Sequence, residues 1–161
     1  VLKQGLKSAS RWAFDIIHEL RHAMQHPEQE NFEVLEIGNE DNSSYSEDEI
    51  DANDFAGDVL LNGQADQLAR EIIINAKGNQ AMLKKQTGLV AVKKGVEVAH
   101  LANYLAYRLQ SEQSISWWST AISLQPQDEN PWHICRQILL ENVNLLQIKE
   151  FDRGLLIRAL S

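Results

Sequence analysis

Apolar residues near the start of the chain recur with the 3.6-residue period of an α-helix. The pattern predicts a helix from Arg11 to Gln25, with Ser8 or Ser10 as its N-cap and Pro27 as its stop. Its apolar side chains cover most of the circumference, so we expect a central helix that packs on several sides. These side chains are Trp12, Phe14, Ile16, Ile17, Leu20, Ala23 and Met24.

The segment after this helix has a different pattern. Residues 32–37 combine the apolar side chains Phe32, Val34, Leu35 and Ile37 in a way that favours one strand or a small hairpin. Residues 39–46 have the polar, turn-rich composition of a loop. The expected fold class is therefore mainly α, an α+β fold with a small β-hairpin or short sheet.

Helical patterns fill the rest of the chain. Ser46 is a suitable cap for a second helix from Glu47 to about Leu61, and a third helix is expected from Ala65 to Ala76. Residues 80–109 predict two or three shorter helices.

Breaks in that last region are expected near Gly88 and Gly95. Two further helices are expected near residues 132–145 and 149–160. We therefore expect a main domain over residues 1–110 and a helical C-terminal extension over residues 111–161.

Composition limits the classes of function. The 161 residues, 43% of them hydrophobic, suffice for one packed domain with an extension. Twenty-three acidic residues against 15 basic ones give a net charge of −8, which is not the basic footprint of a nucleic-acid binder. We therefore expect no direct nucleic acid binding by this segment.

The apolar runs and the cysteine content limit the cellular compartment and the kinds of metal site that we expect. No apolar run approaches the roughly 20 residues of a membrane helix, and no signal peptide opens the chain, so a cytoplasmic protein without membrane contact is expected. Cys135 is the single cysteine, which excludes an internal disulfide framework and a cysteine-rich zinc cluster.

The first predicted helix carries the spacing of a zinc hydrolase site, His-Glu-Leu-Arg-His at residues 18–22. Residues four apart share one helix face, so His18 and His22 can present imidazole nitrogens to one tetrahedral metal ion. Glu19 could take a proton from a metal-bound water and pass it to a leaving amine. This arrangement is typical of a metallopeptidase.

A catalytic zinc ion usually takes a third protein ligand. The second predicted helix offers six carboxylates. We expect Ile50, Phe55 and Val59 to face the core, and Asp51 and Asp54 flank that face most closely. The other four are Glu47, Asp48, Glu49 and Asp58.

Residues 12–26 and 49–61 together resemble the ImmA/IrrE family of zinc metallopeptidases. That family reads F-x-x-x-H-E-L-G-H and then E-x-E-A-(N/D)-x-F-A-x-x-L-L, and this chain has F-D-I-I-H-E-L-R-H and E-I-D-A-N-D-F-A-G-D-V-L-L. The resemblance implies a zincin-like peptidase domain over residues 1–110, with a looser match at residues 93–109, where the family often has a helix-turn-helix-like element.

By position, the resemblance implies that His18, His22 and Asp51 hold Zn²⁺ and that Glu19 is the general base. The implied activity is that of a zinc-dependent metallo-endopeptidase. Its expected partner is a protein substrate such as a basic helix-turn-helix repressor, because such peptidases often act on regulators of phage, mobile-element or stress-response genes. The negative charge of the region before Arg70 is compatible with a basic substrate.

The sequence departs from the family pattern at two positions. Asp51 stands where the family has glutamate, and Arg21 stands where it has glycine. Either change could lower activity. The alternative is therefore a non-catalytic regulatory or toxin-antitoxin-type interaction module that retains the fold, and a structural helical domain without metal is a third interpretation.

Other polar residues near the motif have secondary interpretations. His26 precedes Pro27 at a helix end, which favours a surface or supporting position over a ligand. Asp15 could orient an imidazole, but a surface role in the first turns of the helix is simpler. Three residues are candidates to stabilise an oxyanion, and the sequence does not choose among them: Tyr45, His100 and Tyr104.

Overall fold

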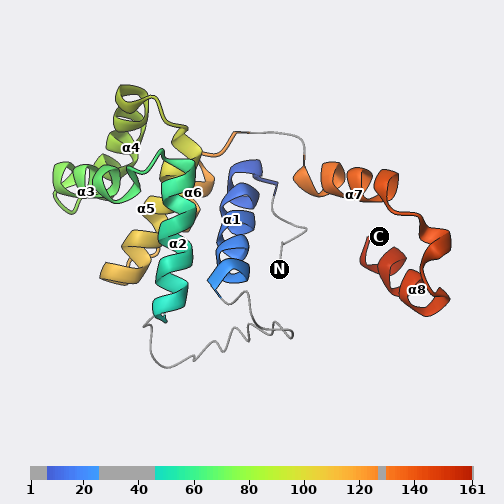
Figure 1. Cartoon of the computed structure of the whole chain (residues 1–161). Coiled ribbons are helices and arrows are strands. Elements are labelled where there is room, and N and C mark those ends of the chain that lie inside the picture. Colours follow the sequence, from blue (N-terminus) through green and yellow to red (C-terminus); the bar gives the residue numbers. More distant parts are fainter. Residues whose placement is uncertain (1–6, 26–45, 127–129, 161) are drawn as a thin grey trace.

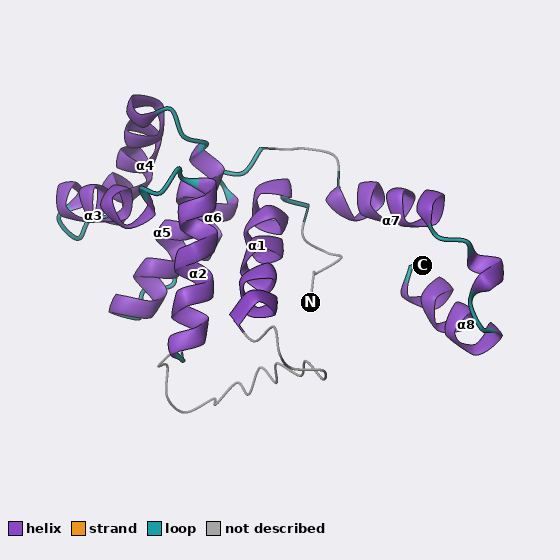
Figure 2. Cartoon of the chain, viewed as in Figure 1, coloured by secondary structure: helices purple, strands orange, loops and turns teal. Residues whose placement is uncertain are grey.

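The computed structural model describes residues 7–25, 46–126 and 130–160, and every regular element in these ranges is helical (Figures 1 and 2). No helix in this part of the chain is long and apolar enough to cross a membrane. The elements are α1 (Ala9–Gln25), α2 (Glu47–Leu60), α3 (Ala65–Ala76), α4 (Gln80–Lys94), α5 (Val98–Gln113), α6 (Trp118–Ile122), α7 (Pro131–Asn142), the 3₁₀ helix η1 (Leu145–Gln147) and α8 (Glu150–Ala159).

The expected α+β fold class is therefore wrong for the described chain. The buried core takes side chains from α1 to α6 and the adjoining loops, and no strand of the described chain takes part in it. A zincin-like core built around a sheet is not what this part of the chain forms. The segment that predicted a strand or hairpin, residues 32–37, lies outside the described residues.

Helix α5 is the central element of the bundle. All nine residues from Leu101 to Leu109 are buried, and helices α1, α2, α3, α4 and α6 all pack against it (Figure 1). Alanines at positions 99, 102 and 106 present small side chains that let neighbouring helices approach closely. Helix α5 is buried on all sides over this stretch, including the polar side chains of Asn103 and Arg108.

The expectation that α1 is central is wrong. Trp12 and Phe14 of α1 are buried, but three apolar residues spaced four apart are exposed on another face. Their exposed fractions are 44% for Ile16, 53% for Leu20 and 52% for Met24. Helix α1 therefore lies at the edge of the bundle, where one face packs on α2 and α5.

Local sequence explains several helix ends. The Ser46 side chain accepts a hydrogen bond from the Glu49 backbone N–H at 3.2 Å, and the Ser8 hydroxyl accepts one from the Arg11 N–H at 3.1 Å, so both predicted caps are confirmed. Helix α4 ends at Gly95, whose φ of +66° favours glycine. The predicted break at Gly88 is wrong, because α4 continues through that residue.

The predicted division after residue 110 falls inside α5. Helix α6 and the preceding Trp117 contribute to the bundle core. Helices α7 and α8 lie to one side of the bundle (Figure 1), where the Trp132 ring contacts the Trp12 ring at a centroid distance of 6.4 Å. The Arg136 Nε donates a 2.8 Å hydrogen bond to the Leu160 carbonyl and links α7 to the end of α8.

Candidate metal centre

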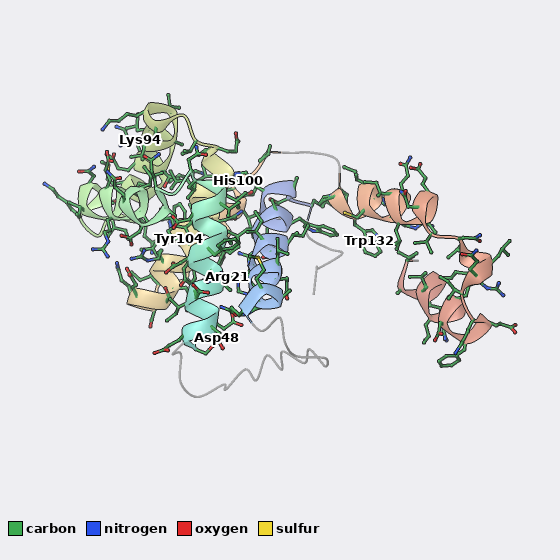
Figure 3. The ribbon with its side chains drawn as sticks, in the orientation of Figure 1. Arg21, Asp48, Lys94, His100, Tyr104 and Trp132 are labelled. Atoms are coloured by element: carbon green, nitrogen blue, oxygen red, sulfur yellow. The ribbon has the colours of Figure 1, made fainter. Side chains whose placement is uncertain are left out.

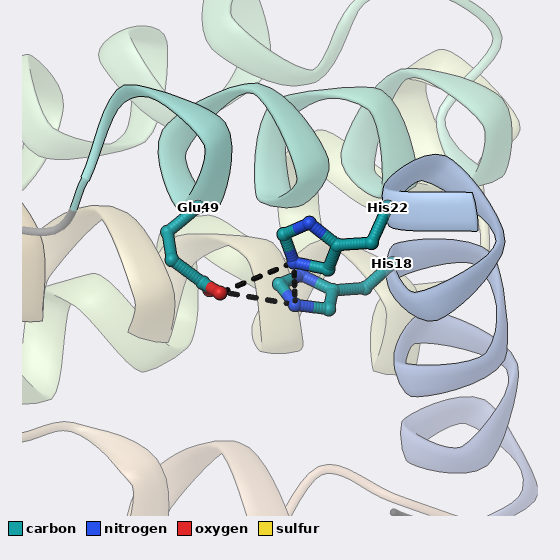
Figure 4. Close-up of side chains that lie close together, drawn as sticks. All are labelled: His18, His22 and Glu49. Atoms are coloured by element: carbon teal, nitrogen blue, oxygen red, sulfur yellow. Dashed lines mark hydrogen bonds and ion pairs between the residues drawn. The ribbon is translucent and has the colours of Figure 1, made fainter. Parts of the chain in front are cut away.

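The last turns of α1 meet the first turn of α2, and polar side chains gather at this junction (Figure 4). Three of them converge: His18 and His22 from α1, and Glu49 from α2. The two Nε2 atoms lie 3.1 Å apart. Glu49 Oε1 lies 3.1 Å from His22 Nε2, and Glu49 Oε2 lies 3.4 Å from His18 Nε2. In the described part of the chain, this cluster could hold a metal ion.

The separations fit a tetrahedral ion. Bonds of about 2.0–2.1 Å from zinc to nitrogen and oxygen place two tetrahedral ligands about 3.4 Å apart. The 3.1 Å separation of the two Nε2 atoms is close to that edge length, and each Nε2 atom has a different oxygen of Glu49 3.1 or 3.4 Å away. The donor set, two imidazole nitrogens and a carboxylate oxygen, also suits a borderline transition metal better than Mg²⁺ or Ca²⁺, which prefer oxygen ligands.

Burial favours the uncharged form of one of the imidazoles. Removal from water lowers the pKa of His18 below its usual value, and the Glu49 carboxylate opposes this shift. The neutral imidazole is the form that binds metals. His18 Nδ1 is buried without a hydrogen-bond partner in the described structure, whereas His22 Nδ1 lies 3.0 Å from Gln25 Oε1.

Glu49 was among the six carboxylates that the sequence offered, but it was not one of the two favoured residues. The face of α2 that is buried consists of Ala52, Asn53, Ala56 and Gly57. Glu49 precedes Ala52 by three residues and Asn53 by four, so it lies on that same face.

The sequence interpretation placed the wrong face of α2 toward the core. Ile50 and Val59 were expected to be inside, yet 42% and 51% of these side chains are exposed. Small side chains bury less area than isoleucine or valine, but they let α2 approach α5 closely. The run of small residues at helical spacing was the feature that indicated the buried face, and with it Glu49.

Asp51 is not brought to the cluster but lies beside it. Arg21 of α1 reaches α2 (Figure 3), where its Nε donates to Asp51 Oδ2 at 2.7 Å and its Nη2 donates to Oδ1 at 3.2 Å. Gln25 Nε2 donates to the same Oδ2 at 2.7 Å. These hydrogen bonds from Arg21 and Gln25 lower the pKa of Asp51, which favours the carboxylate form.

Asp54, the second favoured ligand, belongs to a different polar cluster. It accepts a 2.9 Å hydrogen bond from the Tyr104 hydroxyl, and that hydroxyl also accepts one from Arg108 at 3.2 Å. Burial raises the pKa of Asp54, which the Tyr104 hydrogen bond partly offsets. The Tyr104 hydroxyl, a candidate oxyanion stabiliser, is thus held by Asp54 and Arg108.

The remaining candidates are placed as follows. Glu19 is exposed on α1, next in sequence to His18. Asp15 pairs with Arg11 at 2.9 Å and does not hydrogen-bond the His18 Nδ1. His100 lies on α5, where burial lowers its pKa. His26 and Tyr45 lie outside the described residues.

Family models, curated proteins and solved structures give no match to this chain. The resemblance to the ImmA/IrrE family therefore depends on the two sequence motifs alone. The cluster of His18, His22 and Glu49 stands independently on the distances given above.

Proposed function

We propose that this chain is a zinc-dependent metallo-endopeptidase in which His18, His22 and Glu49 hold the metal ion and Glu19 is the general base. The observation that carries the proposal is the convergence of two imidazole nitrogens and a carboxylate within 3.4 Å of one another. Three potential ligand atoms this close can bind one cation, because the carboxylate oxygen and each imidazole nitrogen without a hydrogen have a lone pair for it.

The donor set supports zinc and a catalytic rather than a structural site. Structural zinc sites in proteins usually have four protein ligands, whereas catalytic sites have three and leave one position open. Among the residues that the structure describes, the cluster has three. Two histidines and a glutamate are a ligand set found in zinc peptidases. Bound zinc would supply Lewis-acid polarisation of a peptide carbonyl and of water.

Glu19 has the chemistry and the exposure of a general base. Its carboxylate follows the ligand His18 on the same helix and is accessible to solvent. There it can accept a proton from the attacking water and donate it to the amine of the cleaved peptide. Its negative charge also acts on His18, where it raises the pKa against the larger effect of burial.

The surroundings favour a substrate segment with basic side chains. Glu47 and Asp48 are exposed in the first turn of α2, directly before the proposed ligand Glu49. Their field attracts lysine and arginine. A basic helix-turn-helix repressor, the substrate type that the family resemblance implies, has this character.

Metal content tests the ligands first. The purified chain is expected to bind one zinc ion, measured by elemental analysis and by competition with a chromophoric chelator. Glu49→Gln should weaken binding by more than about 100-fold, beyond the range usual for outer-shell changes. Glu47→Gln is the matched control, because it removes an exposed carboxylate from the same turn. Equal zinc affinity in Glu49→Gln and the wild type would contradict the site.

A peptide-cleavage assay tests the proposed role of Glu19 as the general base. The zinc-loaded chain is incubated with short random-sequence peptides and with a recombinant basic helix-turn-helix repressor, and products are identified by mass spectrometry. Glu19→Gln should keep the zinc and lose cleavage by about 100-fold or more. Zinc binding without any cleavage would contradict the peptidase activity and leave the alternative, a non-catalytic interaction module.

A further inference from the structure

Four side chains form a continuous row of hydrogen bonds from the surface to the metal centre. Arg21 donates to Asp51, Gln25 donates to Asp51, and Gln25 Oε1 lies 3.0 Å from His22 Nδ1. Three of these residues belong to the last turns of α1, and Asp51 belongs to α2. The row therefore also joins the two helices that carry the proposed ligands.

The Gln25 amide has a single orientation that satisfies its neighbours. Its nitrogen lies 2.7 Å from Asp51 Oδ2 and 3.2 Å from the Asp48 backbone carbonyl, and both of these atoms are acceptors. An amide nitrogen has two hydrogens, so each acceptor receives one. The flipped orientation would place the amide oxygen against both acceptors. Oε1 must therefore face His22.

This orientation determines which nitrogen of His22 carries a hydrogen. Gln25 Oε1 can only accept, so His22 Nδ1 must be the donor. In the neutral imidazole the lone pair is then on Nε2, and Nε2 is the atom that faces Glu49 and His18 (Figure 4). The hydrogen-bond partner of one imidazole nitrogen thus determines whether the other nitrogen has a lone pair available to a metal ion.

The ion pair with Arg21 holds the Asp51 carboxylate in the position where it accepts the hydrogen bond from the Gln25 amide. The guanidinium donates through two nitrogens and also lies over the Phe55 ring, at 5.2 Å from its centroid. A carboxylate held in this way accepts strongly from the Gln25 amide. His18 has no corresponding support, because its Nδ1 is without a partner in the described structure.

We propose that Arg21, Asp51 and Gln25 are positioning residues that hold His22 in the tautomer with Nε2 free for the metal ion. The inference builds on the proposed metal site, but its statement about His22 concerns the metal-free chain as well. It assigns a shared role to Arg21 and Asp51, the two positions at which the chain departs from the family pattern. Arginine at 21 and the shorter carboxylate at 51 form a pair with each other.

The tautomer is tested without metal. Long-range ¹H–¹⁵N spectra of the metal-free chain at pH 9, where imidazolium is a minor form, should show His22 protonated at Nδ1. Gln25→Met removes the acceptor, and His22 should then populate both tautomers. His100 on α5 serves as the internal control, because it lies outside this row of hydrogen bonds and its signals should not change. His18 is not used as a control, because its Nε2 lies 3.1 Å from His22 Nε2 and would respond to a change in the His22 tautomer. His22 signals that are the same in Gln25→Met and the wild type would overturn the proposal.

Zinc affinity gives the second readout. Asp51→Ala should weaken zinc binding by about 10-fold, the lower end of the effect of outer-shell changes, and one zinc ion should still bind at saturation. Asp51→Glu keeps the carboxylate and should restore most of the affinity. Asp48→Ala is the matched control, since it removes a charge from the same turn but keeps the backbone carbonyl that Gln25 uses.

The outcomes separate this proposal from the metal site itself. If Asp51→Ala loses the metal ion completely, as Glu49→Gln should, Asp51 is a ligand and the positioning role is wrong. If the wild-type chain binds no zinc, the proposed function fails, and the His22 spectra still decide the tautomer. Arg21→Met, which changes an ion pair at the helix surface, repeats the test should Asp51→Ala fail to fold.

Discussion

Gly57 of α2 lies directly against the ring of Tyr104 on α5. A Cβ atom added to Gly57 would lie 2.3 Å from Tyr104 Cδ2 and 2.4 Å from Cε2, well inside van der Waals contact. Tyr104 is 1% exposed and is held by hydrogen bonds to Asp54 and Arg108, so its ring has little room to move away. This contact sets how closely α2 approaches the central helix.

Gly57→Ala should therefore destabilise the fold, although alanine is the better helix former. We expect the free energy of unfolding to fall by about 2 kcal/mol, the usual cost of overpacking. Gly88→Ala is the matched control, since Gly88 is inside α4 and an added Cβ meets nothing within 4 Å. That change should stabilise by about 0.5–1 kcal/mol. Urea unfolding followed by circular dichroism measures both, and equal effects would contradict the contact.

If zinc occupies the proposed site, its removal should lower the stability of the chain, because an ion held by both α1 and α2 binds only the folded state. At a free zinc concentration 100 times the dissociation constant, the stabilisation is about 2.7 kcal/mol. A chelator should therefore lower the Tm of the zinc-loaded wild type in a calorimetric scan. Glu49→Gln should show no such decrease at the same zinc concentration. An equal decrease in both chains would mean that zinc binds elsewhere.

Asp66 should make the fold sensitive to acid. The hydrogen bond from Arg108 holds the pKa of Asp66 below its usual value, and burial opposes this only partly. The folded state then binds the proton less tightly than the unfolded state, so the stabilisation is complete above about pH 4 and is lost as pH falls further. Asp66→Asn should lower stability at pH 7.

The difference in unfolding free energy between the wild type and Asp66→Asn should therefore shrink below pH 4. Urea titrations from pH 7 to pH 2.5 measure it. In an Arg108→Met background the difference at pH 7 should be smaller, because only the exposed ion pair of Asp66 with Arg70 at 2.7 Å remains. A difference that stays constant with pH would show that the hydrogen bond does not survive in solution.

Truncation should locate the boundary of the helical bundle. A chain that ends at residue 126 keeps α6 and Trp117, which belong to the core, and lacks α7 and α8, which contribute no residue to it. We expect that chain to fold and to bind zinc with wild-type affinity. A chain that ends at residue 110 loses the end of α5 as well as Trp117, and we expect it to unfold. Circular dichroism and zinc titration distinguish these outcomes.

Part of the site could be read from the sequence, because it depends on a single helix. The spacing of His18 and His22 places both imidazoles on one face of α1, whatever α1 packs against. Their Nε2 atoms do lie 3.1 Å apart. The caps at Ser8 and Ser46 were predictable for the same reason, since each hydrogen bond is made within one turn.

The expected β element shows a second limit of predicting the fold from the sequence, because a local pattern does not determine the type of core. Its sequence pattern lies in residues 32–37, outside the described residues, and the prediction of an α+β core extended that pattern to the whole domain. The described core instead forms around α5, where small alanines let five helices pack together. A short alternating segment carries no information about whether a core is built on a sheet.

The sequence by itself determined the local features of this protein: the helical periods, the caps and the pair of histidines one turn apart. The tertiary structure decided which carboxylate joins them. The rotation of α2 about its axis follows from the close contact of Gly57 with Tyr104, and this contact joins residues that are 47 positions apart in the chain. That rotation turns Glu49 toward the histidines and leaves Asp51 to pair with Arg21, because residues two apart on a helix cannot share one face.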